Sequence, residues 1–108
     1  MNFRVVYTDN FERALKRLAR KYRSMRDDLE VLIDSLEEDP IQGTALGKDC
    51  YKIRLAIKSK GKGKSGGARI VTHVYVSDQQ VYLLTLYDKS EKENISDKEL
   101  QNLLEHIQ

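Results

Sequence analysis

Three cations with no acidic neighbour are the residues of this chain best suited to chemistry on a phosphodiester: Lys52, Arg54 and Arg69. Arginine stays protonated, and its planar fork matches two phosphate oxygens. A lysine crowded by like charges gives up its proton more readily and could act as a base. Metal-free RNA cleavage needs a base for the 2′-hydroxyl, charge to stabilise the phosphorane and an acid for the leaving oxygen. These cations therefore predict an RNA-cleaving site, and the alternative is ordinary solvated charge on an exposed sheet face.

A lysine-glycine segment, residues 58–69, lies between two predicted strands. It holds four glycines, one arginine and no acid, together with the lysines Lys58, Lys60, Lys62 and Lys64. Glycine lets the backbone approach phosphate closely, and lysine supplies the charge. The segment therefore predicts a mobile cationic loop that docks on a polyanion. It is not a P-loop, because Lys58 stands where that motif needs its first glycine, and because the loop leads into a strand.

Charge is unevenly distributed along the 108 residues. The net charge is only +2, yet residues 51–75 carry seven basic side chains and no acidic one, which indicates an anionic partner.

The length suits a single domain over residues 1–108. No apolar run reaches the ~20 residues that span a membrane, and no signal peptide is recognisable. The single cysteine, Cys50, suits a reducing cytosol, so a cytoplasmic protein is expected.

Periodicity predicts the order β-α-α-β-β-β-α, with strands over residues 3–8, 51–58, 68–77 and 81–87. Asp9 and Ser24 are the predicted caps of two helices that end before Pro40, and Ser96 begins a capping box for a short C-terminal helix. Residues 40–49 read as a loop. The fold class is therefore α+β: a small, largely antiparallel four-stranded sheet, an N-terminal helical hairpin on one face and the C-terminal helix.

Alternation within the strands places the cations on a common face. Lys52 and Arg54 point away from Ile53, and Arg69 shares its parity with His73. A structural role is favoured for His73 over a catalytic one. No Cys/His spacing indicates zinc, so we expect neither a metal ion nor another cofactor.

Three segments, residues 50–55, 66–71 and 83–91, resemble the RelE/ParE toxin superfamily. They are most similar to the RelE/HigB-type mRNA interferases of bacterial type II toxin–antitoxin systems. The likeness covers nearly the whole chain, because the element order also matches. The lysine-glycine loop before Arg69, and the Tyr-x-Lys-x-Glu that begins at Tyr87, are typical of the HigB-like branch.

The resemblance implies a ribosome-dependent endoribonuclease that cuts mRNA in the decoding site and thereby inhibits translation. It also implies a cognate antitoxin protein that neutralises the toxin. The partners expected are therefore this antitoxin, the ribosome with its rRNA, and mRNA, with no membrane involved. Lys58, Lys60, Lys62 and Lys64 would form the surface that grips ribosomal RNA.

Catalytic roles follow by position from the same resemblance. Lys52 would be the general base, Arg54 would hold the phosphate and Arg69 would stabilise the transition state. Lys89 would be the general acid or a phosphate contact, although lysine lacks the bidentate fork of arginine. Some relatives stack a tyrosine on the RNA base where this chain has Ile95, and Tyr87 is the candidate substitute.

Three alternatives remain open at the level of the sequence. A ParE-like toxin on the same fold would inhibit DNA gyrase without cutting RNA. A noncatalytic domain could use the same loop to bind RNA and leave it intact. An inactive descendant of a toxin could keep the fold and the loop. The C-terminal helix could be displaced by an antitoxin helix or complete the core, and the core role is favoured.

Overall fold

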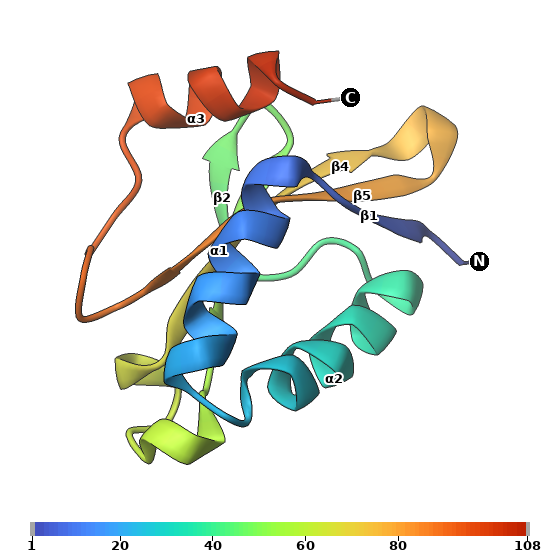
Figure 1. Ribbon diagram of the computed structural model, residues 1–108. Coiled ribbons are helices and arrows are strands. Elements are labelled where there is room, and N and C mark those ends of the chain that lie inside the picture. Colours follow the sequence, from blue (N-terminus) through green and yellow to red (C-terminus); the bar gives the residue numbers. More distant parts are fainter. Residues whose placement is uncertain (1, 108) are drawn as a thin grey trace.

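A five-stranded mixed sheet carries the helices of this protein (Figure 1). The computed structural model describes residues 2–107. In sheet order the strands are β1 (Arg4–Tyr7), β5 (Gln80–Asp88), β4 (Ala68–Tyr75), β3 (Cys50–Leu55) and β2 (Thr44–Gly47). The helices are α1 (Asp9–Lys21), α2 (Met25–Glu38) and α3 (Asp97–Glu105). Three 3₁₀ turns complete the structure: η1 (Lys58–Lys60), η2 (Lys64–Gly66) and η3 (Val76–Asp78).

The α+β class is confirmed, but the prediction of four strands is wrong. The fifth strand, β2, lies in the segment predicted as a loop and pairs antiparallel with β3. Its hairpin turns at Lys48 and Asp49, whose φ angles of 57° and 60° are both positive. That backbone suits a two-residue hairpin, although neither residue is the glycine that normally signals it. β1 runs parallel to β5 at the sheet edge, and the other pairs are antiparallel.

The main hydrophobic core lies between the α1–α2 hairpin and one face of the sheet. The cap of α1 is Thr8, not the predicted Asp9, because the Thr8 hydroxyl accepts a hydrogen bond from the Phe11 amide. Phe11 and Leu18 are completely buried against the strands. The rest of this core comes from both helices, from β3, β4 and β5, and from the segment just after β3: Leu15, Met25, Leu29, Leu32, Leu36, Ile53, Ile57, Ala68, Ile70, Leu83 and Leu86.

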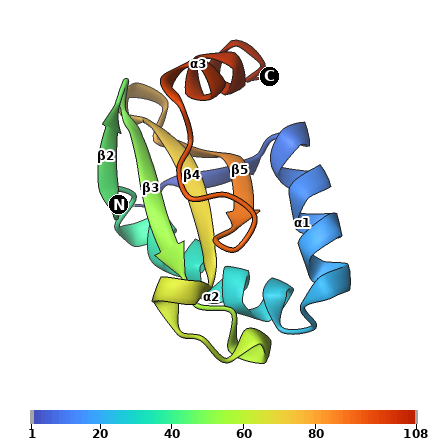
Figure 2. The ribbon, with the colours of Figure 1, turned by 90° about the vertical axis from the view of Figure 1, so that its left-hand side faces the viewer.

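A smaller core lies on the opposite face, under α3 (Figure 2). Leu100 of α3 is buried with Cys50, Val71 and Leu84 of the strands, so this helix completes a core as favoured from the sequence. The predicted capping box at Ser96 is confirmed, with reciprocal hydrogen bonds to Glu99. Among residues 2–107, none of the helices is both long and apolar enough to cross a membrane.

The base of the lysine-glycine loop is hydrogen-bonded to the helical hairpin, and the predicted mobility of the loop stays a prediction. The amide of Lys58 donates to the buried carboxylate of Asp28 (2.9 Å). The amide of Ser59 donates to the hydroxyl of Ser24 (2.8 Å). Ser24 therefore holds the loop in place and does not cap α2 with its side chain. These contacts join segments about 30 positions apart, which local sequence patterns do not reveal.

Asp88, at the end of β5, joins the loop to the helical hairpin. Its side chain is fully buried, and its carboxylate accepts hydrogen bonds from Tyr22 (2.5 Å), Lys60 (2.7 Å) and the Ser90 hydroxyl (2.8 Å). The ammonium of Lys21 lies 3.6 Å away. Burial alone would raise the pKa of Asp88, but the hydrogen bonds from Lys60, Tyr22 and Ser90 outweigh it and hold the pKa far below its usual range.

We predict that Asp88→Asn destabilises the fold by about 3 kcal/mol at neutral pH, because it leaves the buried Lys60 ammonium without its counter-charge. The depressed pKa means that the folded state favours the carboxylate. The stabilisation is therefore complete above the ordinary pKa of 3.8 and decreases as the pH falls below it. Urea unfolding at several pH values measures this difference. The control is Asp78→Asn at an exposed turn, and an equal effect of both variants would contradict the assignment.

Candidate functional site

A row of three side chains crosses the sheet on the face opposite the α1–α2 hairpin. In the strand register, Arg54 of β3 lies beside Arg69 of β4, and Arg69 lies beside Tyr87 of β5. Side chains directly opposite one another on a sheet face are close neighbours, with Cβ atoms roughly 5 Å apart. The structure thus brings together three of the five predicted catalytic residues.

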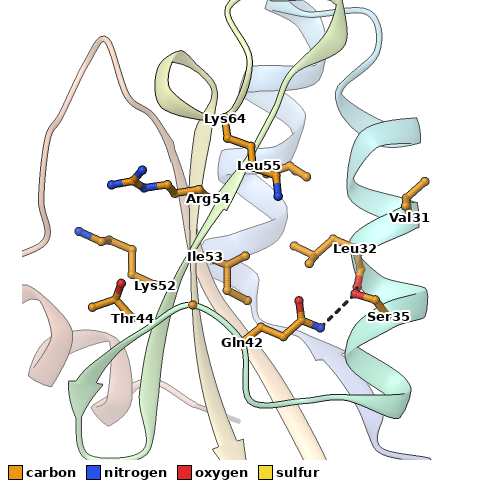
Figure 3. Close-up of a pocket in the computed structure, with 11 residues that line it drawn as sticks. Val31, Leu32, Ser35, Gln42, Thr44, Lys52, Ile53, Arg54, Leu55 and Lys64 are labelled. Atoms are coloured by element: carbon orange, nitrogen blue, oxygen red, sulfur yellow. Dashed lines mark hydrogen bonds between the residues drawn. The ribbon is translucent and has the colours of Figure 1, made fainter.

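Lys52 joins the same face from β3. Figure 3 shows Lys52 and Arg54 projecting to the same side, away from α2, while Ile53 between them points toward α2. Arg54 is exposed and Lys52 is half-buried. The predicted alternation along this strand is therefore confirmed. Both cations, with Lys64, also border a groove at the edge of the sheet, between α2, the start of β2 and β3.

Arg69 is buried, with only 3 % of its surface exposed. Its guanidinium donates to the backbone carbonyls of Lys64 (3.0 Å), Ala68 (3.1 Å) and Ser65 (3.3 Å). Burial, and next the charge of the neighbouring Arg54, lower the pKa of Arg69 from its usual value. The residue predicted to contact the transition state is therefore covered by the loop in this conformation.

Tyr87 is also buried, and its ring lies beneath the ammonium of Lys92, which is 5.6 Å from the ring centroid. Burial raises the pKa of Tyr87, although Arg69 opposes this shift. Among residues 2–107, the Tyr87 hydroxyl has no hydrogen-bond partner. The predicted stacking role of Tyr87 stays a prediction, and it requires Lys92 to move off the ring. Ile95 packs in the core under α3.

The segment between β5 and α3, residues 89–96, borders the cationic face (Figure 2). The ammonium of Lys52 donates to the side-chain oxygen of Asn94 (2.9 Å). Lys89 is half-buried, and its ammonium lies 3.5 Å from a carboxylate oxygen of Glu93. This segment therefore sets the position of Lys52 and carries Lys89 to the edge of the site.

The four loop lysines differ in exposure. Lys58, Lys62 and Lys64 are exposed. Lys60 is not, because only 10 % of its side chain is accessible and its ammonium is bound to Asp88. In this conformation Lys60 anchors the loop and is not available to RNA.

His73 lies on β4 at the far end from the row of cations. Its Nδ1 is 3.5 Å from the Sγ of Cys50, and its ring packs near that of Tyr82. Burial raises the pKa of the Cys50 thiol to about 11. These contacts fit the structural role favoured for His73. Within residues 2–107, no group of three or more His, Cys, Asp or Glu side chains forms a candidate metal site.

Comparison with known proteins identifies the family. A family model described as the RelE toxin of the RelE / RelB toxin–antitoxin system matches residues 4–107. The chain belongs to the RelE toxin family. This confirms the resemblance seen in the sequence, and the assignment to a HigB-like branch stays a prediction.

Solved RelE structures share the fold of this RelE family member. A double mutant of the E. coli RelE toxin in the free state is 21% identical, with a TM-score of 0.64 and 100% coverage of both chains. The intact E. coli RelBE toxin–antitoxin complex contains a chain that is 20% identical (TM-score 0.61; 82% of this chain and 96% of that chain covered). The Mycobacterium tuberculosis RelBE2 complex gives 14% identity (TM-score 0.58; 82% and 99% covered). At such identities the likeness shows the fold alone.

Sequence reasoning missed three residues around the candidate site: Asp88, Asn94 and Lys92. Asp88 stands next to the predicted Tyr87 and Lys89, but its partners Tyr22 and Lys60 lie far from it in the sequence. Asn94 and Lys92 lie in an irregular segment and contact the site only through the folded chain. No local pattern marks them.

Proposed function

We propose that this RelE family member is a ribosome-dependent endoribonuclease that cleaves mRNA and inhibits translation. The observation that carries the proposal is the cationic row on the sheet: Arg54 beside Arg69, with Lys52 on the same face. No acid occurs between residues 51 and 75 to neutralise it. Charge held on strands stabilises a transition state better than charge on a flexible tether, because it needs no reorganisation during the reaction.

The proposed roles are those that the family resemblance implies, and the chemistry of each group is compatible with its role. Lys52 removes the proton from the 2′-hydroxyl, whose oxygen then attacks the adjacent phosphorus. Arg54 and Arg69 neutralise the non-bridging oxygens of the resulting phosphorane. Lys89 donates a proton to the 5′-oxygen as its bond to phosphorus breaks. The products are a 2′,3′-cyclic phosphate and a 5′-hydroxyl.

We further infer a cognate antitoxin as the protein partner. Two of the similar structures are described as toxin–antitoxin complexes, RelBE and RelBE2, and their matched chains share this fold. The excess of positive charge on the cationic face favours an acidic contact segment in the antitoxin.

We predict that Arg54→Ala lowers the single-turnover rate of mRNA cleavage on programmed ribosomes by about 100-fold, the usual effect of removing one transition-state charge contact. Because Arg54 is exposed, its removal leaves the fold stable. Primer extension on the cleaved message gives the rate.

The matched control is Arg20→Ala, which removes the same charge from α1, on the opposite side of the sheet. It should cleave at the wild-type rate. Equal rates for Arg54→Ala and the wild type would remove Arg54 from the mechanism. If the wild type leaves ribosome-bound mRNA intact, the proposed function itself is wrong.

We also predict that replacing Lys58, Lys62 and Lys64 with Gln weakens binding to the ribosome. Each lysine that contacts phosphate releases about one counterion, so the slope of log affinity against log salt should fall by roughly two to three. Lys60 is kept, because it anchors the loop to Asp88. Sedimentation with ribosomes over a range of salt concentrations measures the slope.

The control is a triple Gln variant at three lysines outside the loop, Lys16, Lys48 and Lys98, all exposed. It has the same net charge as the loop variant. If both triple variants lower the slope equally, the loop has no special part in docking.

A further inference from the structure

Arg69 cannot reach a phosphate while the loop keeps its present conformation. Its guanidinium donates to three backbone carbonyls, two of which belong to Lys64 and Ser65 in the η2 turn of the loop. Only 3 % of its surface is exposed, whereas its neighbour Arg54 is open to solvent. A group that stabilises a phosphorane must exchange these carbonyls for phosphate oxygens, and that requires the turn to move.

Both ends of the loop are fixed, which restricts the movement to its middle. At the start, Lys58 and Ser59 are bound to the helical hairpin, and Lys60 is bound to Asp88. At the end, the carbonyl of Gly67 accepts a hydrogen bond from the Lys89 amide (3.0 Å). Gly67 also packs so closely on the Leu55 carbonyl that a Cβ atom would collide with it.

The Gly61 amide still bonds to the base of the loop, at the carbonyls of Ile57 (3.3 Å) and Lys58 (3.1 Å), and beyond it Arg69 donates to two carbonyls of the loop. Gly61 and Gly63 are exposed, both have positive φ angles (77° and 64°), and no atom lies within 4 Å of where their Cβ atoms would be. The η2 turn follows directly, and its carbonyls are those bound by Arg69. Two glycines before the turn form a natural hinge.

We propose that the Lys64–Ser65 backbone is a latch that withholds Arg69 from RNA until the loop engages the ribosome. This inference rests on the proposed function and adds a closed state to it. Lys62 and Lys64 carry their charges on the same segment that holds the latch. These two lysines are exposed in the closed loop as well, so they only bring RNA to it. A phosphate that contacts Arg69 can bind only the open loop, so RNA held by the two lysines shifts the loop to its open state and completes the site. The free toxin, with Arg69 covered, leaves unbound RNA intact.

Gly63→Ala tests the latch without touching a predicted catalytic residue. Gly63 combines a φ of 64° with a ψ of −166°, a conformation that is strained for alanine, so the variant disfavours the closed loop alone. The open loop is free to adopt other angles. Gly47→Ala is the matched control, because Gly47 also has a positive φ (89°) and open space but lies in the β2–β3 hairpin.

The first measurement is the exchange with water of the Arg69 Nη protons, followed by NMR in protein labelled with ¹⁵N-arginine. In the wild type these protons should exchange more slowly than those of the exposed Arg54. Gly63→Ala should speed Arg69 exchange roughly tenfold, since the strain opens the latch more often, whereas Gly47→Ala should not change it. Unchanged exchange in Gly63→Ala would show that the loop does not restrict Arg69 and would overturn the proposal.

The second measurement is cleavage on programmed ribosomes as a function of ribosome concentration. A closed state lowers apparent affinity by the fraction of molecules that are open. Gly63→Ala should therefore cleave several-fold faster than the wild type at limiting ribosomes and equally fast at saturation. If Gly63→Ala speeds Arg69 exchange but does not speed cleavage at limiting ribosomes, Arg69 has a structural role. That result would overturn the latch and leave the proposed function standing. A wild type that never cleaves would overturn both the proposed function and the latch.

Discussion

The buried carboxylate of Asp88 holds together the segments on which the candidate site depends. It binds Tyr22 at the end of α1 and Lys60 in the loop, and it orders the turn after β5 through Ser90. A charge without access to water is stable only when such partners compensate it, so each of these contacts fixes the position of the others. The loop base, the hairpin and the exit of β5 therefore form one unit.

That unit determines what the cationic face can do. Because the ammonium of Lys60 is bound to the buried Asp88, the base of the loop is held in place. The other three lysines of the loop point to solvent. Tyr87 lies opposite Arg69 on the face that carries Arg54, and Lys89 follows directly after the end of β5 at Asp88. The sheet supplies rigid charge and the loop supplies docking charge, and Arg69 lies where the two meet.

Local sequence patterns predicted the strands and helices that have clear periodicity. They failed for elements whose structure depends on contacts between distant parts of the chain. The basic face was predictable, since Lys52 and Arg54 alternate along β3 with apolar residues that are buried or partly buried. β2 was missed because its short sequence ends in Gly47 and its turn lacks a glycine at either positive φ. A bulge opposite β4 was also hidden, and it turns Leu84 into the core under α3, although strict alternation would place it with Leu86.

The sequence predicted which cations belong to the site, but it did not predict how their side chains are covered and hydrogen-bonded in the fold. The sequence placed Arg69 in the site, yet no local pattern indicates that the backbone carbonyls of Lys64 and Ser65 cover it.

In the proposed mechanism the cations of the site act on an RNA phosphate that is attacked by the adjacent 2′-hydroxyl. The decisive experiment uses a ribosome-bound message with a 2′-O-methyl group at the nucleotide that is normally cut. We predict no cleavage at that position, and 5′-hydroxyl ends on the unmodified message. Cleavage at the methylated position, or 5′-phosphate ends, would show that the mechanism is wrong.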